Sequence, residues 1–310
     1  MKPEKRKLQI IDKANKRARK LKPQCFFSSC SESAVKSHSQ SKRSLNNISV
    51  GGKVIGISRP YFSPPQYVDD WFKEISIGQA SLFKGFCGKH DNEFFKSVDD
   101  FELTSLDKET LAKLAFRTFA MEIRRKQQAS CVLSTIIRES EGMFHIPEDP
   151  RLLCEGIKIF LEKDYPYYLN RFETIFDSDN YDDVESAVFL LPRNIGISCS
   201  TVINPIDEEI GDIQPLMSFT VLPNSDATTV LFTYFLSDKQ AVMNFIGAHD
   251  KLEDIVFNRC EEVLFNPALF RSLTDNDKRT ITKGLAHWMS WEKVQCPDLL
   301  GVNLTSPDYY

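Results

Sequence analysis

The stretch that decides the fold opens with CFFSSC, from Cys25 to Cys30, and closes with CGKHD, from Cys87 to Asp91. Cys25 and Cys30 form one candidate pair of metal ligands, and Cys87 with His90 forms another. Zinc in proteins takes four thiolate or imidazole ligands at the corners of a tetrahedron, often as two short pairs. The spacing therefore predicts a structural zinc site built from both ends of this stretch.

A second histidine lies between the two pairs, in the segment KSHSQSKRSL (residues 36–45). This residue, His38, could replace His90 as the fourth ligand, since three cysteines with either histidine make a suitable set. We prefer His90, because two residues between ligands is the tight knuckle spacing and because this choice leaves His38 free. The module is poor in apolar residues, so zinc binding is expected to contribute to its folding.

Length and composition are those of a globular protein: 310 residues, 42% apolar and 26% charged. No apolar run reaches the ~18 residues of a membrane span, and the charged N-terminus lacks the apolar segment of a secretory signal. We therefore expect a cytoplasmic protein without membrane contact, in which clustered cysteines bind metal rather than form disulfides. The dispersed cysteines are expected to be small buried hydrophobes: Cys131, Cys154, Cys199, Cys260 and Cys296.

Charge is unevenly distributed along the chain. Residues 1–43 hold thirteen basic and three acidic side chains, whereas the whole chain carries −4, so the remainder carries −14. This polarity indicates an anionic partner, nucleic acid, for the N-terminal part. The alternative is a solvated basic helix that only maintains solubility. The candidate nucleic-acid-binding residues are Arg17, Arg19, Lys20, Lys36, Lys42 and Arg43.

The N-terminal elements are expected to be short. Residues 4–22 predict an exposed basic helix, because their apolar residues are too sparse for a buried face. Residues 46–58 predict a β-hairpin turned at two glycines, and residues 59–70 a proline-rich loop. A strand or loop within residues 79–95 should lead into a short helix that starts near Asp91.

A helical period begins at Ser105, a candidate N-cap, and continues to Ser140. A second helix is expected over residues 150–176, with Pro150 in its first turn and a kink at Pro166. β-rich runs follow an acidic turn: AVFLLP, IGISCSTVI, PLMSFTVLP and TTVLFTYFL. Three C-terminal helices are expected at residues 237–249, 251–265 and 275–291.

The sequence thus predicts an α+β protein with a zinc-stapled N-terminal module, a helical middle, and an antiparallel sheet with C-terminal helices. The expected parts are a basic helix (1–24), the zinc module (25–103), a helical segment (104–180) and an α+β C-terminal domain (181–310).

The order of features in residues 25–95 resembles the HNH class of treble-clef, ββα-metal nucleases. In their zinc-stapled versions, a first cysteine pair precedes a histidine on a hairpin, and a second pair leads into a helix that carries a metal ligand. The resemblance implies that His38 is the general base that activates water, and that Asp91 holds a catalytic Mg²⁺ or Mn²⁺ ion. It also implies that Lys42 or Arg43 neutralises the phosphodiester.

The chain departs from that pattern. Ser37 stands where an acidic residue usually helps to bind the catalytic metal, the helix offers no second histidine, and Asn46 or Asn47 match the mid-motif asparagine loosely. The whole layout resembles uncharacterised bacterial proteins from mobile or phage-defence loci, which implies an antiviral nuclease. The alternative is a non-enzymatic zinc module that binds nucleic acid or a protein partner from the same locus, with the C-terminal half as sensor or assembly platform. A third is structural zinc with an unrelated activity in residues 105–310.

Other polar residues favour structural roles. His249 and His287 lie on helical patterns, and His145 is a lone loop histidine. An acidic run is expected to be a solvated turn: Asp177, Asp179, Asp182 and Asp183. The glycine motifs of nucleotide hydrolases and dinucleotide-binding proteins are absent, as is the nucleophile elbow, so the sequence indicates none of these chemistries.

Overall fold

The computed structural model describes residues 3–57, 71–99, 106–140, 150–206, 212–285, 295–296 and 299–310. The fold is α+β. The helices are α1 (Pro3–Arg19), α2 (Lys42–Asn46), α3 (Gly88–Glu93), α4 (Lys96–Asp99), α5 (Lys108–Ser140), α6 (Pro150–Ile159), α7 (Tyr165–Ser178), α8 (Lys239–Ala248), α9 (Leu252–Arg259), α10 (Pro267–Ser272) and α11 (Asp275–Leu285). The strands are β1 (Lys36–His38), β2 (Lys53–Ile57), β3 (Phe72–Ser76), β4 (Leu82–Lys84), β5 (Val184–Leu191), β6 (Ile197–Ile203), β7 (Met217–Pro223), β8 (Thr228–Phe235), β9 (Val263–Phe265) and β10 (Asp308–Tyr309).

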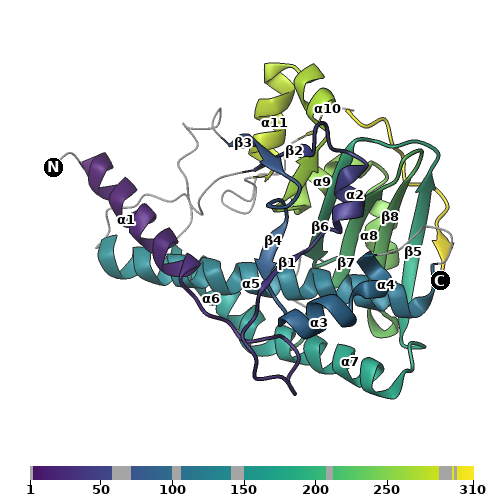
Figure 1. Ribbon diagram of the computed structural model, residues 1–310, viewed down its shortest axis with the longest axis horizontal. Helices are drawn as coiled ribbons and strands as arrows, with labels where there is room; N and C mark the ends of the chain where they lie inside the picture. Colours follow the sequence, from purple (N-terminus) through teal and green to yellow (C-terminus); the bar gives the residue numbers. More distant parts are fainter. Residues whose placement is uncertain are drawn as a thin grey trace.

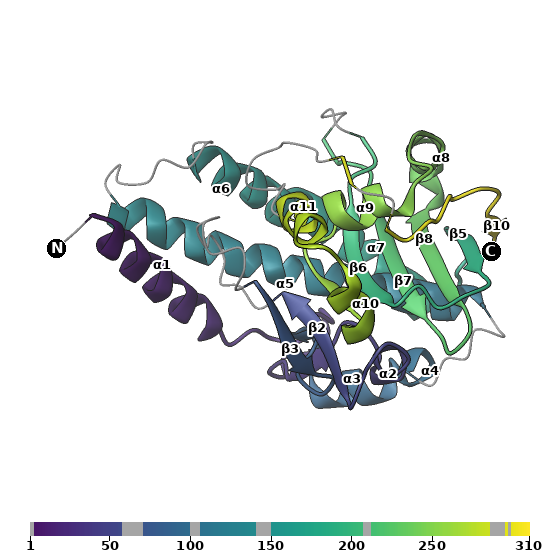
Figure 2. The same ribbon diagram turned by 90° about the horizontal axis from the view of Figure 1, so that it is seen from above.

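Eight of these strands form one antiparallel sheet in the order β10-β5-β8-β7-β6-β9-β2-β3. The long helix α5 crosses one face together with α7, while α8, α9 and α11 lie on the other (Figures 1 and 2). The N-terminal strands β2 and β3 extend the sheet at the β9 edge. Residues 25–103 therefore share their sheet with the C-terminal part of the chain.

The central strands are apolar on both sides because helices cover both faces of the sheet. On β8, Val230 and Phe232 pack against the core that includes α8 and α9. Leu231 and Phe235, which point the other way, pack against the core that includes α5 and α7. The predicted β-rich runs are confirmed as β5, β6, β7 and β8.

Helix α5 is the platform on which the N-terminal region is built. It has 33 residues and so spans about 50 Å. Its first turn is capped by Asp107, whose side chain accepts a 2.7 Å hydrogen bond from the Thr110 amide. The predicted cap, Ser105, lies outside the described residues.

The expectation that the basic helix has no buried face is wrong. Helix α1 packs lengthwise along the C-terminal half of α5 (Figure 2). Its buried residues include two isoleucines and small alanines that allow close approach: Ile10, Ile11, Ala14 and Ala18. They meet Ala129, Val132, Leu133 and Ile136 of α5. The alanines were missed because the prediction counted only large side chains.

The predicted hairpin over residues 46–58 is wrong in its first half. Ser41 caps α2 by accepting a hydrogen bond from the Ser44 amide at 3.1 Å, and this helix runs to Asn46, so the chain enters the glycine turn from a helix instead of a strand. The glycine turn is present, with φ of +60° at Gly51 and +71° at Gly52. Across this turn only Val50 pairs, with Lys53, and the rest of β2 pairs with β3. The proline-rich loop lies outside the described residues.

The helix expected near Asp91 starts earlier, at Gly88, because Cys87 caps it. The helix expected over residues 150–176 is present as α6 and α7, joined by a short π-helix (Phe160–Asp164) just before Pro166, which has no amide proton to donate.

The C-terminal helices need one correction. Helix α9 ends at Arg259. The predicted helix extended to residue 265, but its last residues form β9, which pairs with β6 on one side and β2 on the other. Trp288 and Trp291, expected on the last helix, lie outside the described residues. Within the described part of the chain, no helix is long and apolar enough to cross a membrane.

Candidate metal centre

Two short strands and one helix position the centre. Strand β1 pairs antiparallel with β4, with Ser37 opposite Phe83 and His38 opposite Leu82. The chain leaves β4, turns at Gly85 and enters α3 at Cys87, whose sulfur accepts from the His90 amide. The segment before β1 returns to the same place, since the Phe26 amide donates to the Gly85 carbonyl at 3.0 Å. Both predicted ligand pairs therefore lie side by side.

The structure brings the four predicted ligands together. The ligand atoms of Cys25, Cys30, Cys87 and His90 all lie within 4.8 Å of one another. The Cys30 and Cys87 sulfurs are 3.8 Å apart, and Nδ1 of His90 is 3.2 Å from the Cys25 sulfur and 3.5 Å from that of Cys87. A tetrahedral zinc ion with ordinary bond lengths separates two sulfurs by about 3.8 Å and sulfur from nitrogen by about 3.5 Å. The cluster therefore fits a zinc ion, with His90 binding through Nδ1.

The protonation of the thiols is consistent with a metal site. Burial raises the pKa of Cys25 to about 11, against weaker lowering by backbone hydrogen bonds. For Cys87 burial also raises the pKa, but the His90 amide and the Cys30 thiol lower it more, so it lies below the ordinary value. The four groups thus include a buried thiol that needs a cation to ionise.

Aromatic packing fixes the centre against α5. The ring of Phe27 lies 4.3 Å from the His90 ring and 5.4 Å from that of Phe116, which belongs to α5. Arg124, also on α5, covers the Phe26 ring at 4.3 Å. Its guanidinium donates to the carbonyls of Gln24 and Lys84 at 3.1 and 2.6 Å. One side chain of α5 thus ties the first knuckle to β4.

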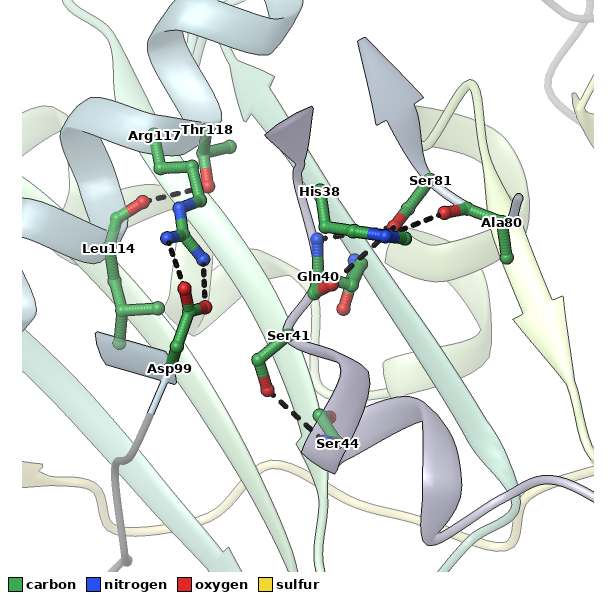
Figure 3. A network of polar contacts seen from close by, with 10 residues as sticks. All are labelled: His38, Gln40, Ser41, Ser44, Ala80, Ser81, Asp99, Leu114, Arg117 and Thr118. Carbon is green, nitrogen blue, oxygen red and sulfur yellow. Dashed lines mark hydrogen bonds and ion pairs between the residues drawn. The ribbon is translucent and has the colours of Figure 1, made fainter. Parts of the chain in front are cut away.

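His38, at the end of β1, is held in one tautomer. Its Nδ1–H donates to the Ala80 carbonyl at 2.9 Å, and the ring points toward that residue (Figure 3). Nε2 is thereby left as the basic nitrogen. Burial lowers the pKa of His38; the Ala80 bond raises it, and the charge of Lys42 lowers it further. His38 is therefore neutral at pH 7, with a lone pair on Nε2.

Asp91, on α3, lies close to His38 and to Ser37. Burial raises the pKa of Asp91, while the Ser37 hydroxyl and the positive charge of Arg117 lower it. The Asp91 charge in turn raises the pKa of His38. The two residues that the HNH resemblance singled out therefore come from different elements and lie close enough for their charges to interact.

Arg117, which the sequence reasoning missed, organises this neighbourhood. Its side chain is only 2% exposed and makes two hydrogen bonds, of 2.7 and 3.2 Å, to the carboxylate of Asp99 on α4 (Figure 3). Its guanidinium also lies 4.3 Å above the Phe95 ring. A basic residue in the apolar face of a predicted helix is the signal that could have identified it, since such a charge needs a partner.

Among the described residues, the four zinc-type ligands are the one group of three or more His, Cys, Asp or Glu side chains close enough to hold an ion. His38, Asp91 and Asp99 do not form a second such group. In the acidic turn, Asp183 pairs with Arg171 at 2.6 Å. His249 is structural, since its Nδ1–H donates to the Phe245 carbonyl and its ring stacks on Phe245. His145 and His287 lie outside the described residues.

The predicted nucleic-acid-binding residues are all exposed and fall into two places. Arg17 and Arg19 lie on the outer side of α1, with Lys20 directly after it. Lys36 lies on β1, and Lys42 with Arg43 begins α2. The second place adjoins His38, because Lys42 is close enough to lower its pKa.

Comparison with known proteins identified no relative of this chain. No protein-family model matches the chain, and neither a curated protein nor a solved structure shows significant similarity to it.

Proposed function

We propose that residues 25–95 form a zinc-stapled, treble-clef module of HNH type that binds nucleic acid and cleaves it with a divalent cation. The proposal is supported by His38 on β1 and Asp91 on α3, which lie within range of each other's charge and in the same module as a cluster that fits zinc. A first knuckle, a two-stranded ladder, a second knuckle and a helix follow in the order of that nuclease class.

In this proposal His38 is the general base. Its Nδ1–H is fixed by the Ala80 carbonyl, and its neutral Nε2 takes a proton from water as that water attacks the phosphorus atom. Asp91 contributes a carboxylate oxygen to Mg²⁺ or Mn²⁺. Such ions are often bound by one or two carboxylates, water and substrate phosphates, so the site needs no preformed triad of ligands. Lys42, whose charge reaches His38, would neutralise the phosphodiester.

The zinc site has a structural role in this scheme. Its ligands are three cysteines and one histidine with no open position, the arrangement typical of structural zinc. The bound ion holds the start of α3 against the segment that leads into β1. Asp91 follows the ligand His90 directly, so zinc also sets the position of Asp91.

The test is a cleavage assay with supercoiled plasmid and structured RNA, with Mg²⁺ and Mn²⁺ in turn. His38→Ala should retain zinc and nucleic-acid affinity, and lose ~10²–10⁴-fold in rate, the usual effect of removing a general base. His249→Ala is the matched control, because it removes a histidine with the same backbone hydrogen bond on the other side of the sheet. Equal rates for wild type and His38→Ala contradict the proposal.

A second function is supported by Ser37, which occupies the position of the missing acidic residue and is buried beside Asp91. In that case the module binds nucleic acid or a protein partner without cleaving, and the C-terminal half is a sensor or platform. A wild type that never cleaves, together with a His38→Ala variant that loses zinc, would establish this alternative.

We further propose a role in bacterial anti-phage defence, on the basis of the overall resemblance of the layout. Bacteria that express the wild-type protein should then plate phage less efficiently than bacteria that express His38→Ala at the same level. Equal plating efficiencies would remove this role and leave the biochemical proposal intact.

A further inference from the structure

Helix α6 presents two large apolar side chains to solvent. It packs on α5, which lies between α6 and α1 (Figure 2), through a core that includes Ile157. Neither Leu152 nor Ile159 belongs to that core, and they are 67% and 44% exposed. Leu152 is the most exposed large apolar residue in the described part of the chain. Residues seven positions apart lie on one face of a helix, so the two form an apolar stripe.

A glycine interrupts the middle of this stripe. Gly156 follows Leu152 by four residues and precedes Ile159 by three, so it lies on the same face. A Cβ at Gly156 would meet no described atom within 4 Å, and its backbone is helical. Neither crowding within the chain nor backbone conformation therefore requires glycine there, although glycine weakens a helix interior. What a glycine does allow at this point is the close approach of a second backbone.

The charges beside the stripe match those of a second copy. Glu155 precedes Gly156 by one residue and Lys158 follows it by two, and both are exposed on one side of the stripe. Two α6 helices that cross antiparallel at Gly156 bring Glu155 of each beside Lys158 of the other, and Leu152 beside Ile159. A parallel pair would instead place like charges together.

Lys158 can accept this second carboxylate at little cost. Its one printed partner is Glu162 in its own helix, at 3.8 Å, and the two side chains are 67% and 64% exposed. Such an exposed pair contributes little to stability. Lys158 can therefore lie between Glu162 of its own helix and Glu155 of the second copy.

We propose that α6 is a homodimer contact, in which Leu152, Gly156 and Ile159 pack antiparallel against the same residues of a second copy. The self-complementary order of Glu155 and Lys158 favours a second copy over an unrelated protein. Helix α6 has ten residues, and an interface of this length is smaller than a standard one, so the dimer should be weak and reversible. The inference does not depend on the proposed cleavage.

The experiment measures self-association of the full chain by sedimentation, from about 10 μM to about 1 mM, the range of weak association. The wild type should show a dimer that increases with concentration. Leu152→Gln should weaken the dimer about tenfold or more, because each dimer loses two apolar side chains from its centre. Leu190→Gln is the matched control, since Leu190 is a 53% exposed leucine on β5, and it should associate as the wild type does.

A change at Gly156 separates association from folding. Gly156→Gln adds a side chain where the monomer has open space and replaces a poor helix former by a better one. The melting temperature of dilute protein should therefore stay the same or rise, while the dimer weakens because the two backbones can no longer approach. A lower melting temperature would show that the monomer itself needs this glycine, and would count against the proposal.

Charge exchange tests the antiparallel arrangement. At low salt, where exposed charges are screened least, Glu155→Lys and Lys158→Glu should each self-associate severalfold more weakly than the wild type, because each places like charges together. An equal mixture of the two variants should recover the dimer, since lysine at 155 of one copy then meets glutamate at 158 of the other. The double variant should also recover it.

Recovery in the mixture, together with loss in Leu152→Gln, supports the proposal. A protein that stays monomeric up to about 1 mM overturns it, as does a dimer that these variants leave unchanged, because that dimer uses another surface. A dimer that Leu152→Gln weakens, but that the mixture of charge variants does not recover, also overturns the antiparallel contact at Gly156.

Discussion

Arg117 on α5 donates hydrogen bonds to both carboxylate oxygens of Asp99 on α4, at 2.7 and 3.2 Å. The guanidinium is 2% exposed, so removing its partner leaves a buried charge. Because the Asp99 side chain is itself 46% exposed, we expect Asp99→Ala to lower the free energy of unfolding by about 1–3 kcal/mol, the cost of leaving a buried donor unpaired. Arg117→Met, which fills a similar volume without a charge, should cost less.

Denaturant unfolding of Asp99→Ala, of Arg117→Met and of the double variant measures the interaction free energy between the two side chains. Asp182→Ala is the control, because Asp182 is 91% exposed and 3.8 Å from Lys108, and such pairs contribute about 0–1 kcal/mol. An Asp99→Ala variant as stable as that control would mean that the Arg117 charge is solvated without Asp99.

Metal removal should unfold the N-terminal module. The purified protein is expected to contain one zinc per chain, because the cluster at Cys25 and Cys87 fits a single tetrahedral ion. Cys25→Ser or Cys87→Ser should lose zinc and melt at a much lower temperature, since metal binding and folding are coupled in such modules. Cys154→Ser is the control, as Cys154 lies on α6 outside the cluster. Freshly purified, unchelated protein without zinc in elemental analysis would refute the site.

The state of His38 can be followed by its titration. Burial lowers its pKa in the folded protein, so the folded state favours the neutral ring. Stability from this residue is present above the ordinary histidine pKa of about 6.5. It is lost as the pH falls from there through the lower pKa of the folded state. Cleavage should decline over the same acidic range.

NMR titration of the imidazole measures this pKa directly, and the pH–rate profile should give the same midpoint. The signal that His38→Ala loses and His249→Ala keeps is assigned to His38. A His38 midpoint at or above 6.5 would show that the Ala80 hydrogen bond and the charges of Asp91 and Asp99 together outweigh burial and Lys42.

The basic helix can be tested without truncation. Deleting α1 would expose the α5 residues beneath it, such as Val132 and Leu133, and so confuse charge with folding. We instead expect the triple change Arg17→Gln, Arg19→Gln and Lys20→Gln to weaken binding to duplex DNA. If all three contact phosphates, the slope of log affinity against log salt should fall by about 3.

The control for that variant neutralises three basic residues on the other side of the sheet: Lys251, Arg279 and Lys283. It should leave the slope unchanged. If the α1 variant and this control bind alike, the basic helix contributes solubility rather than contacts to DNA.

The sequence predicted what depends on local spacing. Cys87 and His90 share one turn of helix, and the central strands are rich in β-branched and aromatic residues, so both features were visible in single segments. That Cys25 and Cys87 belong to one metal site could also be predicted from the sequence, because zinc requires four ligands from a small set of residue types.

Features that depend on distant partners were not predictable. Strand β9 has three residues and pairs with β6 and β2, which no local period reveals. Gln40 is buried because its amide bonds to Ser198 and to Ser200, at 3.2 Å in the second case. These residues are 158 and 160 positions away in the chain. The buried face of α1 was missed because it relies on alanines that need the surface of α5.

The insertion of β2 between β3 and β9 has a consequence for biosynthesis. Residues 25–90 leave the ribosome long before Val263, so a growing chain can assemble the metal cluster while β2 still lacks its neighbour. Gln40, two residues after His38, likewise waits for Ser198 and Ser200. The segment that carries His38 can therefore reach its folded position only when most of the chain has been made. A nascent fragment would therefore bind zinc before the His38 segment is in place, and the cleavage proposed above would have to wait until the sheet is complete.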